Sequence, residues 1–223
     1  LQEEDRTIMA RSIPKFIDWI DNRIWNLYFI IHQTPLKEQM QKAMVRMITQ
    51  YLDHTRIGTH LSNLLMEFVQ NAEKAHFERL IIKNNLAKKE EVDTYLRDRG
   101  NRQFIIDEAT RRDQMLEISW SMASERGAGG RNYRIIITVS NYGLIDERTR
   151  SLLHNKMKTN VDGIGLASFY EGGGDADKLG AGLGLLYNSY LEDLCRKEGI
   201  FYKTSIFPEM RHEKTTVQME LAL

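Results

Sequence analysis

The sequence predicts a protein of the α/β class, because it contains two kinds of hydrophobic periodicity. Apolar residues recur at helical spacing through much of the chain up to residue 83 and again from 183 to 197. In two later segments, 116–120 and 133–139, apolar and polar residues alternate, as is typical of half-buried strands. A glycine-rich run at 127–130 lies between these segments. We therefore expect an antiparallel hairpin with a glycine-rich tip, combined with several helices.

Two amphipathic helices are expected at the start of the chain. The first would span about 12–31, with Pro14 in its first turn, where a proline is tolerated. Thr34-Pro35 would break the chain before a second helix at about 36–54. The two helices could pair with each other, pack on the sheet, or form a homodimer. We assign residues 1–57 to this N-terminal helical segment.

A second region, 58–223, is expected to form the main domain. It would begin with a helix at 58–83 whose apolar stripe faces the core. The next stretch, 84–113, mixes acidic and basic residues, and we interpret it as a helical insertion that is either a solvated hairpin or a docking surface. The remaining elements would be a short helix at 147–156, a glycine-rich loop at 159–179, a helix at 183–197, and strands at 200–206 and 216–223.

The composition limits the classes of function. The 223 residues carry 31 Lys and Arg against 31 Asp and Glu, so no global basic field favours nucleic acid or an anionic membrane. No apolar run reaches the roughly 20 residues that cross a bilayer. The single cysteine, Cys195, can form no intrachain disulfide and fits the apolar face of its helix. We expect a cytoplasmic protein and, because the chain opens on Leu1-Gln2, further sequence upstream.

Two motifs carry the chemistry. In Gly180-Ala181-Gly182-Leu183-Gly184-Leu185, three alternating glycines open an apolar helix. Backbone N–H groups at such a helix start can receive phosphate, because no side chain blocks the anion and the helix dipole favours negative charge. Much earlier in the chain, Glu67 and Asn71 are four residues apart and therefore share one face of a helix. A carboxylate and a carboxamide together can hold a divalent cation or position a nucleophile.

In this order and at this separation, the motifs resemble those of the GHKL superfamily of ATP-binding domains. That superfamily includes sensor histidine kinases, gyrase B, Hsp90, MutL and the anti-sigma-factor serine kinases. The resemblance runs from about Gly58 to the C-terminus and implies a Bergerat fold, an α/β sandwich of a mostly antiparallel sheet layered with helices. The family's N box is similar to the segment at 67–75, its first glycine box to 139–145, and its closing strand to 215–221.

The resemblance also implies the cofactors and the roles of individual residues. Glu67 would polarise an attacking hydroxyl or water, and Asn71 would help to hold the Mg²⁺ that accompanies ATP. Lys74 would either approach a phosphate or be solvated, and the loop at 159–179 would be the lid over the triphosphate. The other residues that the resemblance places around the nucleotide are Ser140, Asn141, Gly143, Ile145, Lys178, Gly180, Gly182, Leu183, Gly184, Leu185 and Thr216.

One position departs from the family pattern. Ser140 stands where the family has the Asp whose carboxylate accepts a hydrogen bond from the adenine amino group, and Tyr142 stands where the first glycine would be. Asn141 and Gly143 match the pattern. A serine is shorter and neutral, although its hydroxyl can accept a hydrogen bond directly or through water. The departure predicts weaker adenine binding or a rebuilt pocket.

We expect the domain to transfer phosphate to a separate protein, as a serine-kinase-like regulator, or to hydrolyse ATP. Two alternatives stay open. The first is a nucleotide-free interaction module that uses the same fold as a binding surface. The second is the catalytic end of a truncated sensor histidine kinase. For the second, His32-Gln33-Thr34-Pro35-Leu36 is similar to the phosphoacceptor motif but two residues short, so a loop histidine is the preferred interpretation.

Overall fold

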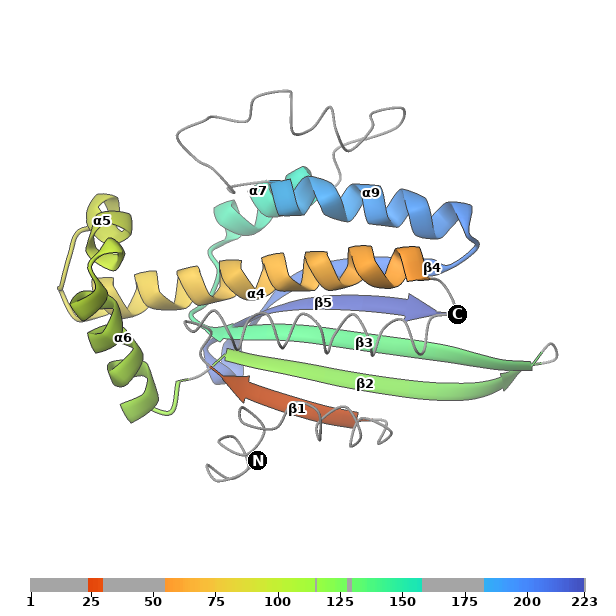
Figure 1. The fold of residues 1–223 in the computed structure, drawn as a ribbon, viewed down its shortest axis with the longest axis horizontal. Helices are drawn as coiled ribbons and strands as arrows, with labels where there is room; N and C mark the ends of the chain where they lie inside the picture. The colour runs from red at the N-terminus through yellow and green to blue at the C-terminus, as the bar shows by residue number, and fades with distance from the viewer. Residues whose placement is uncertain (1–23, 30–54, 115, 128–129, 158–182, 223) are drawn as a thin grey trace.

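The computed structural model describes residues 24–29, 55–114, 116–127, 130–157 and 183–222. These residues form an α/β sandwich, in which helices cover one face of a five-stranded sheet (Figure 1). The predicted fold class is therefore confirmed. Among the described residues, no helix is long and apolar enough to cross a membrane.

All neighbouring strands of the sheet are antiparallel, and their order is β1-β2-β3-β5-β4. The predicted hairpin is confirmed, because β2 pairs with β3 from Glu117 opposite Ser140 to Gly127 opposite Gly130. The strands predicted near the C-terminus are also present as β4 and β5, which form the second hairpin of the sheet. The bounds of the strands are β1 Ile24–Phe29, β2 Leu116–Gly127, β3 Gly130–Tyr142, β4 Phe201–Glu209 and β5 Lys214–Ala222.

The first strand corrects the expected helix over 12–31. Residues Ile24–Phe29 form strand β1, which pairs with β2 from Ile24 opposite Ser121 to Phe29 opposite Leu116. The run Ile-Trp-Asn-Leu-Tyr-Phe is rich in β-branched and aromatic residues, and a short apolar run of this kind fits a helix and a strand equally well by periodicity. The strand forms because its backbone groups can pair with the edge of β2 that β3 leaves open. The rest of 12–31 and the second expected helix, with the homodimer and His32, lie outside the described residues.

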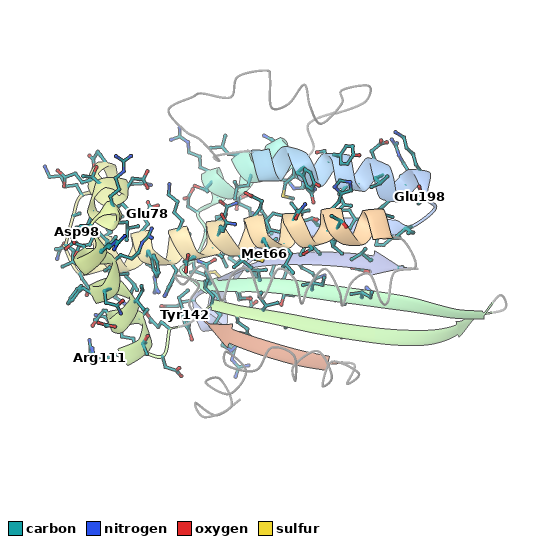
Figure 2. The ribbon with its side chains drawn as sticks, in the orientation of Figure 1. Met66, Glu78, Asp98, Arg111, Tyr142 and Glu198 are labelled. Carbon is teal, nitrogen blue, oxygen red and sulfur yellow. The ribbon has the colours of Figure 1, made fainter. Side chains whose placement is uncertain are left out.

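Three long helices lie on one face of the sheet (Figure 1). They are α4 Thr55–Lys83, α7 Glu147–Met157 and α9 Leu183–Lys197, close to the predicted bounds. Figure 2 shows Met66 midway along α4, where this side chain joins the core between the helices and the sheet. Cys195 is fully buried in the same core, as predicted. The core side chains of α4 are Ile57, Leu61, Leu64, Leu65, Met66, Phe68, Val69 and Ala72.

The insertion after α4 is helical, as predicted, and has a small core of its own. It consists of the 3₁₀ turn η1 Lys89–Glu91, α5 Val92–Arg97 and α6 Arg99–Arg111. Asp98 caps α6 by accepting a hydrogen bond from the N–H of Asn101 at 2.9 Å. The insertion packs on the last turns of α4. The buried side chains of this second core are Phe77, Leu80, Ile81, Val92, Leu96, Ile105, Ile106 and Ala109.

Candidate functional site

The register of β3 fixes which residues of the first glycine box face the helices. Ile135, Ile137 and Val139 are buried in the core beneath α4. Because side chains alternate between the two faces of a strand, Asn141 lies on the helix face and Ser140 on the opposite face. The same reasoning applies to β5, where Thr215 lies directly opposite Asn141 and shares its face.

Ser140 and Thr216 form a polar pair on the face of the sheet away from α4. Their hydroxyl oxygens are 2.8 Å apart, and both residues are buried. The Thr216 hydroxyl also hydrogen-bonds to the carboxylate of Glu209 at the end of β4. The structure therefore brings Ser140 and Thr216 together, but it separates both of them from the layer that contains Glu67 and Asn71.

Asn141 is buried on the helix face and held in one orientation. Its exposed fraction is 8%. The side-chain Nδ2 donates a hydrogen bond to the carbonyl of Tyr142 at 3.1 Å. Only the amide nitrogen can face a carbonyl oxygen favourably, so this contact assigns the orientation of the carboxamide. The Oδ1 atom is left as an acceptor.

Thr215 fixes the loop that follows β3. Its hydroxyl donates to the carbonyl of Gly143 at 2.6 Å and accepts from the N–H of Ile145 at 2.8 Å. The N–H of Gly143 donates to the carbonyl of Glu213 at 2.7 Å. Sequence reasoning selected Thr216 rather than Thr215. The alternation of Thr215 with the core residues Val217 and Met219 is the signal that would have identified it.

Gly143 is required at its position for two reasons. Its φ is +116°, a backbone conformation that side chains disfavour. A Cβ atom there would also lie 2.9 Å from Cδ of Arg79 on α4. Arg79 in turn forms an ion pair with Glu213 at 3.3 Å. The loop is therefore held closely against the helix that carries the N box.

His76 on α4 lies beside the last residue of β3, Tyr142. Its ring centroid lies 6.1 Å from that of Tyr142, which Figure 2 shows at the end of the strand. The His76 side chain is buried and neither ring nitrogen has a hydrogen-bond partner among the described residues, and burial lowers its pKa. This histidine continues the apolar stripe of α4 and was not selected from the sequence.

The two N-box residues can be placed along α4 from this reference point. Asn71 lies five residues before His76, or about 7.5 Å along the axis, and Glu67 lies about 13.5 Å before it. Since α4 and β3 run in the same direction (Figure 1), Asn71 and Asn141 lie within about one helical turn of each other along that direction. Glu67 is half-buried and Asn71 exposed, and neither has a hydrogen-bond or ion-pair partner among the described residues.

Lys74 points toward the insertion. Its ammonium group pairs with the carboxylate of Asp93 on α5 at 3.0 Å. More than half of each side chain is exposed, so the pair stabilises the fold by at most about 1 kcal/mol. The ammonium is thus weakly held and can exchange Asp93 for another anion.

The second glycine box is described only in part. Leu183, Gly184 and Leu185 form the first turn of α9, as predicted for a box that opens a helix. Gly180, Gly182, Lys178 and the glycine-rich loop at 159–179 lie outside the described residues. The first turn of α9 contains no acidic residue that would oppose an anion.

A family model matches residues 1–223. The chain belongs to DUF8084, a family of unknown function. A protein of Treponema pallidum (strain Nichols) is 25% identical to the DUF8084 chain over 206 residues, which cover 92% of this chain and 52% of that protein. The chain therefore spans about half the length of this relative.

Among solved structures, the DUF8084 chain is similar to a chain of the SiaB–SiaC complex of Pseudomonas aeruginosa. The superposition covers 95% of this chain and 97% of the other, with a TM-score of 0.37 and 13% sequence identity.

The candidate residues on α4 offer oxygen donors but do not form a preformed metal-binding site. Among the described residues, no three His, Cys, Asp or Glu side chains converge on a point that could hold a metal ion. Glu67 and Asn71 on α4 instead supply one carboxylate and one carboxamide oxygen donor. Such donors suit Mg²⁺, which is commonly held by one or two protein oxygens together with substrate phosphates.

Proposed function

We propose that this domain binds ATP and Mg²⁺ in the manner of the GHKL superfamily and transfers the γ-phosphoryl group to a protein partner or to water. The observation that carries the proposal is the position of Asn141. This residue lies on the helix face at the end of β3 and is buried, and its acceptor oxygen has no hydrogen-bond partner among the described residues.

The carboxamide of Asn141 can replace the carboxylate that the family pattern requires. The adenine ring presents an amino group at carbon 6, which donates a hydrogen bond, whereas guanine presents a carbonyl oxygen there. Because Nδ2 of Asn141 is bonded to the Tyr142 carbonyl, Oδ1 is the atom that would meet the base. An acceptor at this point favours adenine. The departure at Ser140 is then a shift of one residue along β3, and Thr215 rather than Thr216 is its counterpart on β5.

Glu67 and Asn71 have the chemistry needed for the transfer step. Asn71 would hold Mg²⁺, which when bound neutralises charge on the phosphates. Glu67, one turn earlier on α4, has a carboxylate with no partner among the described residues. It would accept the proton of the attacking hydroxyl or water. The loop held by Thr215 keeps Asn141 in place while the start of α9 faces the phosphates.

The acceptor is proposed to be a separate protein. Phosphoryl transfer depends mainly on positioning and charge stabilisation, so the same residues serve a serine hydroxyl or a water molecule. The histidine-kinase alternative needs a phosphoacceptor histidine, and the segment at His32 that is similar to such a motif is two residues short and lies outside the described residues. We therefore place the serine-kinase-like function first and ATP hydrolysis second.

Calorimetric titration of the protein with ATP, ADP and GTP, with and without Mg²⁺, tests the proposal. We expect Mg²⁺-dependent ATP binding in the micromolar range and weaker GTP binding. Asn141→Ala and Asn71→Ala should abolish it, whereas Ser140→Ala and Gln70→Ala, the neighbouring controls, should retain it. Circular dichroism of each variant separates loss of binding from loss of fold.

Two outcomes would contradict the proposal in different ways. Loss of ATP binding in Ser140→Ala but not in Asn141→Ala would return the base contact to Ser140. No binding of any nucleotide at millimolar concentration would favour the nucleotide-free interaction module. If ATP binds, incubation with radiolabelled ATP then distinguishes release of phosphate from its transfer to added protein.

A further inference from the structure

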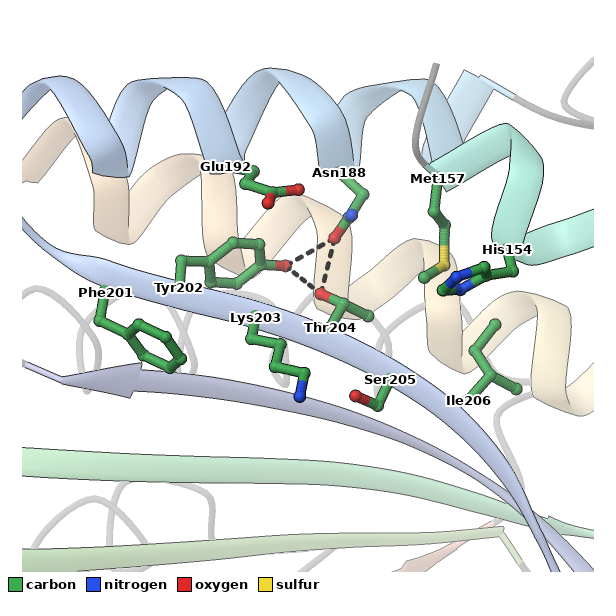
Figure 3. Close-up of a pocket in the computed structure, with 10 residues that line it drawn as sticks. All are labelled: His154, Met157, Asn188, Glu192, Phe201, Tyr202, Lys203, Thr204, Ser205 and Ile206. Carbon is green, nitrogen blue, oxygen red and sulfur yellow. Dashed lines mark hydrogen bonds between the residues drawn. The ribbon is translucent and has the colours of Figure 1, made fainter. Parts of the chain in front are cut away.

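A groove of about 570 Å³ runs along β4, the last strand in the sheet order. Figure 3 shows its walls, formed by α7 and α9 on one side and β4 on the other. We call it the β4 groove. The residues that line it are His154 and Met157 from α7, Asn188 and Glu192 from α9, and Phe201, Tyr202, Lys203, Thr204, Ser205 and Ile206 from β4.

The groove follows the edge of the strand rather than one face of it. Six consecutive residues of β4 line it, although successive side chains point to opposite faces. Tyr202 and Thr204 point toward α9, whereas Phe201 and Lys203 point to the other side (Figure 3). A groove can touch both sets only where the backbone edge between them is open. Within the described sheet β4 pairs on one side only, with β5.

The helix side of the groove is held rigid by a hydrogen-bond network. The hydroxyls of Tyr202 and Thr204 both donate to Oδ1 of Asn188, at 2.8 and 2.7 Å, and lie 2.7 Å from each other. Asn188 and Tyr202 are buried. This network joins α9 to β4 and positions the helix side of the groove.

Two opposite charges flank the open edge and are not neutralised. Glu192 on α9 and Lys203 on β4 are both exposed, and neither forms an ion pair with any described residue. Glu192 lies on the helix side of β4 and Lys203 projects from the other side (Figure 3). A strand added to this edge would place one residue near Glu192 and the next residue near Lys203, because neighbouring side chains alternate.

We propose that the β4 groove binds an extended segment of a partner protein, which adds to β4 as a further strand. The segment carries a basic side chain facing Glu192 and, next to it in sequence, an acidic side chain facing Lys203. Main-chain hydrogen bonds to the open edge supply affinity, and the two charges supply specificity and register. This docking site uses no residue of the proposed nucleotide site, and the proposal does not depend on nucleotide binding.

A second copy of this chain fits the groove less well. Residues paired across two antiparallel strands share a face of the sheet. In a two-fold-symmetric dimer, antiparallel pairing of two β4 strands keeps the helices of both copies on one face, so Tyr202, Thr204 and Ile206 of the copy would lie on the helix side, and none of these is basic. Glu192 would stay unpaired.

Defined peptides test the proposal with the whole chain. The probe is the labelled octapeptide Thr-Val-Thr-Lys-Glu-Val-Thr-Val, compared by fluorescence anisotropy with versions in which the central pair is Lys-Lys or Glu-Glu. We expect the Lys-Glu peptide to bind about fivefold or more tightly than either, because each of the others places one like charge against the groove. Methylation of alternate backbone nitrogens on the bonding edge should abolish binding.

Charge reversal on the protein should change the preference in a predictable direction. Lys203→Glu should make the Lys-Lys peptide the tightest ligand, and Glu192→Lys should make the Glu-Glu peptide the tightest. The matched controls are Glu198→Lys and Arg211→Glu, which change the net charge equally at exposed positions outside the groove, and these should keep the Lys-Glu preference.

Three results would overturn the inference. The first is equal binding of the three peptides by every variant, or no saturation by any of them at millimolar concentration. The second is undiminished binding of the methylated peptide, which would exclude strand addition. The third is a concentration-dependent dimer in sedimentation that Lys203→Glu dissolves while no peptide binds, which would make a second copy the occupant.

Discussion

Replacing Gly143 with alanine measures how tightly the loop after β3 is held against α4. At φ of +116° a Cβ atom introduces backbone strain of about 1–3 kcal/mol. The new methyl group would also meet Cδ of Arg79 at 2.9 Å, so that side chain must move. Movement of Arg79 breaks its ion pair with Glu213, which contributes at most about 1 kcal/mol because Glu213 is largely exposed. The sum is about 1–4 kcal/mol of lost stability.

Thermal and urea unfolding provide the assay. For a chain of this size a loss of 3 kcal/mol lowers Tm by roughly 6–12 °C. Gly199→Ala is the matched control, because Gly199 also has positive φ, +72°, but nothing lies within 4 Å of its Cβ position. It should lose only the strain of a left-handed alanine, about 1–2 kcal/mol.

The comparison isolates the contact with Arg79. In an Arg79→Ala background the extra cost of Gly143→Ala over Gly199→Ala should shrink, since the obstructing atom is gone. The reasoning is refuted if Gly143→Ala destabilises the protein no more than Gly199→Ala does, or if the Arg79→Ala background leaves the difference unchanged.

Three further predictions concern buried side chains with a polar or ionisable group. Burial lowers the pKa of His76, so below its unfolded value of 6.5 the unfolded state binds the extra proton and stability falls as pH falls. The free energy of unfolding, measured with urea at several pH values between 7 and 5, should therefore fall more steeply with falling pH for the wild type than for His76→Gln, by up to about 1.4 kcal/mol per pH unit. An equal dependence on pH in the two proteins would contradict this. Thr215→Val should lose about 1–3 kcal/mol of unfolding free energy, because the buried hydroxyl that joins Gly143 and Ile145 disappears. An unchanged Tm in calorimetry would show that these two hydrogen bonds do not hold the loop. Burial raises the pKa of the Cys195 thiol to about 12, so a thiol reagent at pH 8 should react only after denaturant is added, and rapid labelling of the native protein would argue against the packing.

Much of the fold was predictable because its elements follow the simplest periodicities. The hairpin of β2 and β3, the helices α4, α7 and α9, and the final two strands all follow alternating or helical patterns that no other interaction overrides. Strand β1 was not predictable in this way. Its six residues are apolar enough for either structure, and pairing with a distant strand determined the outcome.

The site was predicted less completely, because a motif gives residue types and spacing but not the face on which each residue lies. Ser140 and Asn141 are adjacent, and only the burial of Val139 and Ile137 establishes which of them faces the helices. For the same reason Thr216 was selected from the sequence, although Thr215 is the residue of β5 that faces the helices. The second core, beneath α5 and α6, was not predicted because the insertion is dominated by charged residues. Its few apolar side chains form a core only together with the end of α4, which is distant from α6 in the sequence.

The pairing of β1 with β2 has a practical consequence for truncation. A boundary at 57, which the sequence places between a helical segment and a domain, would remove the strand that covers Leu116–Ser121 of β2. Those six residues would then present unpaired backbone groups on a long hairpin, which invites aggregation between molecules. A shortened protein that keeps β2 paired should therefore begin before Ile24.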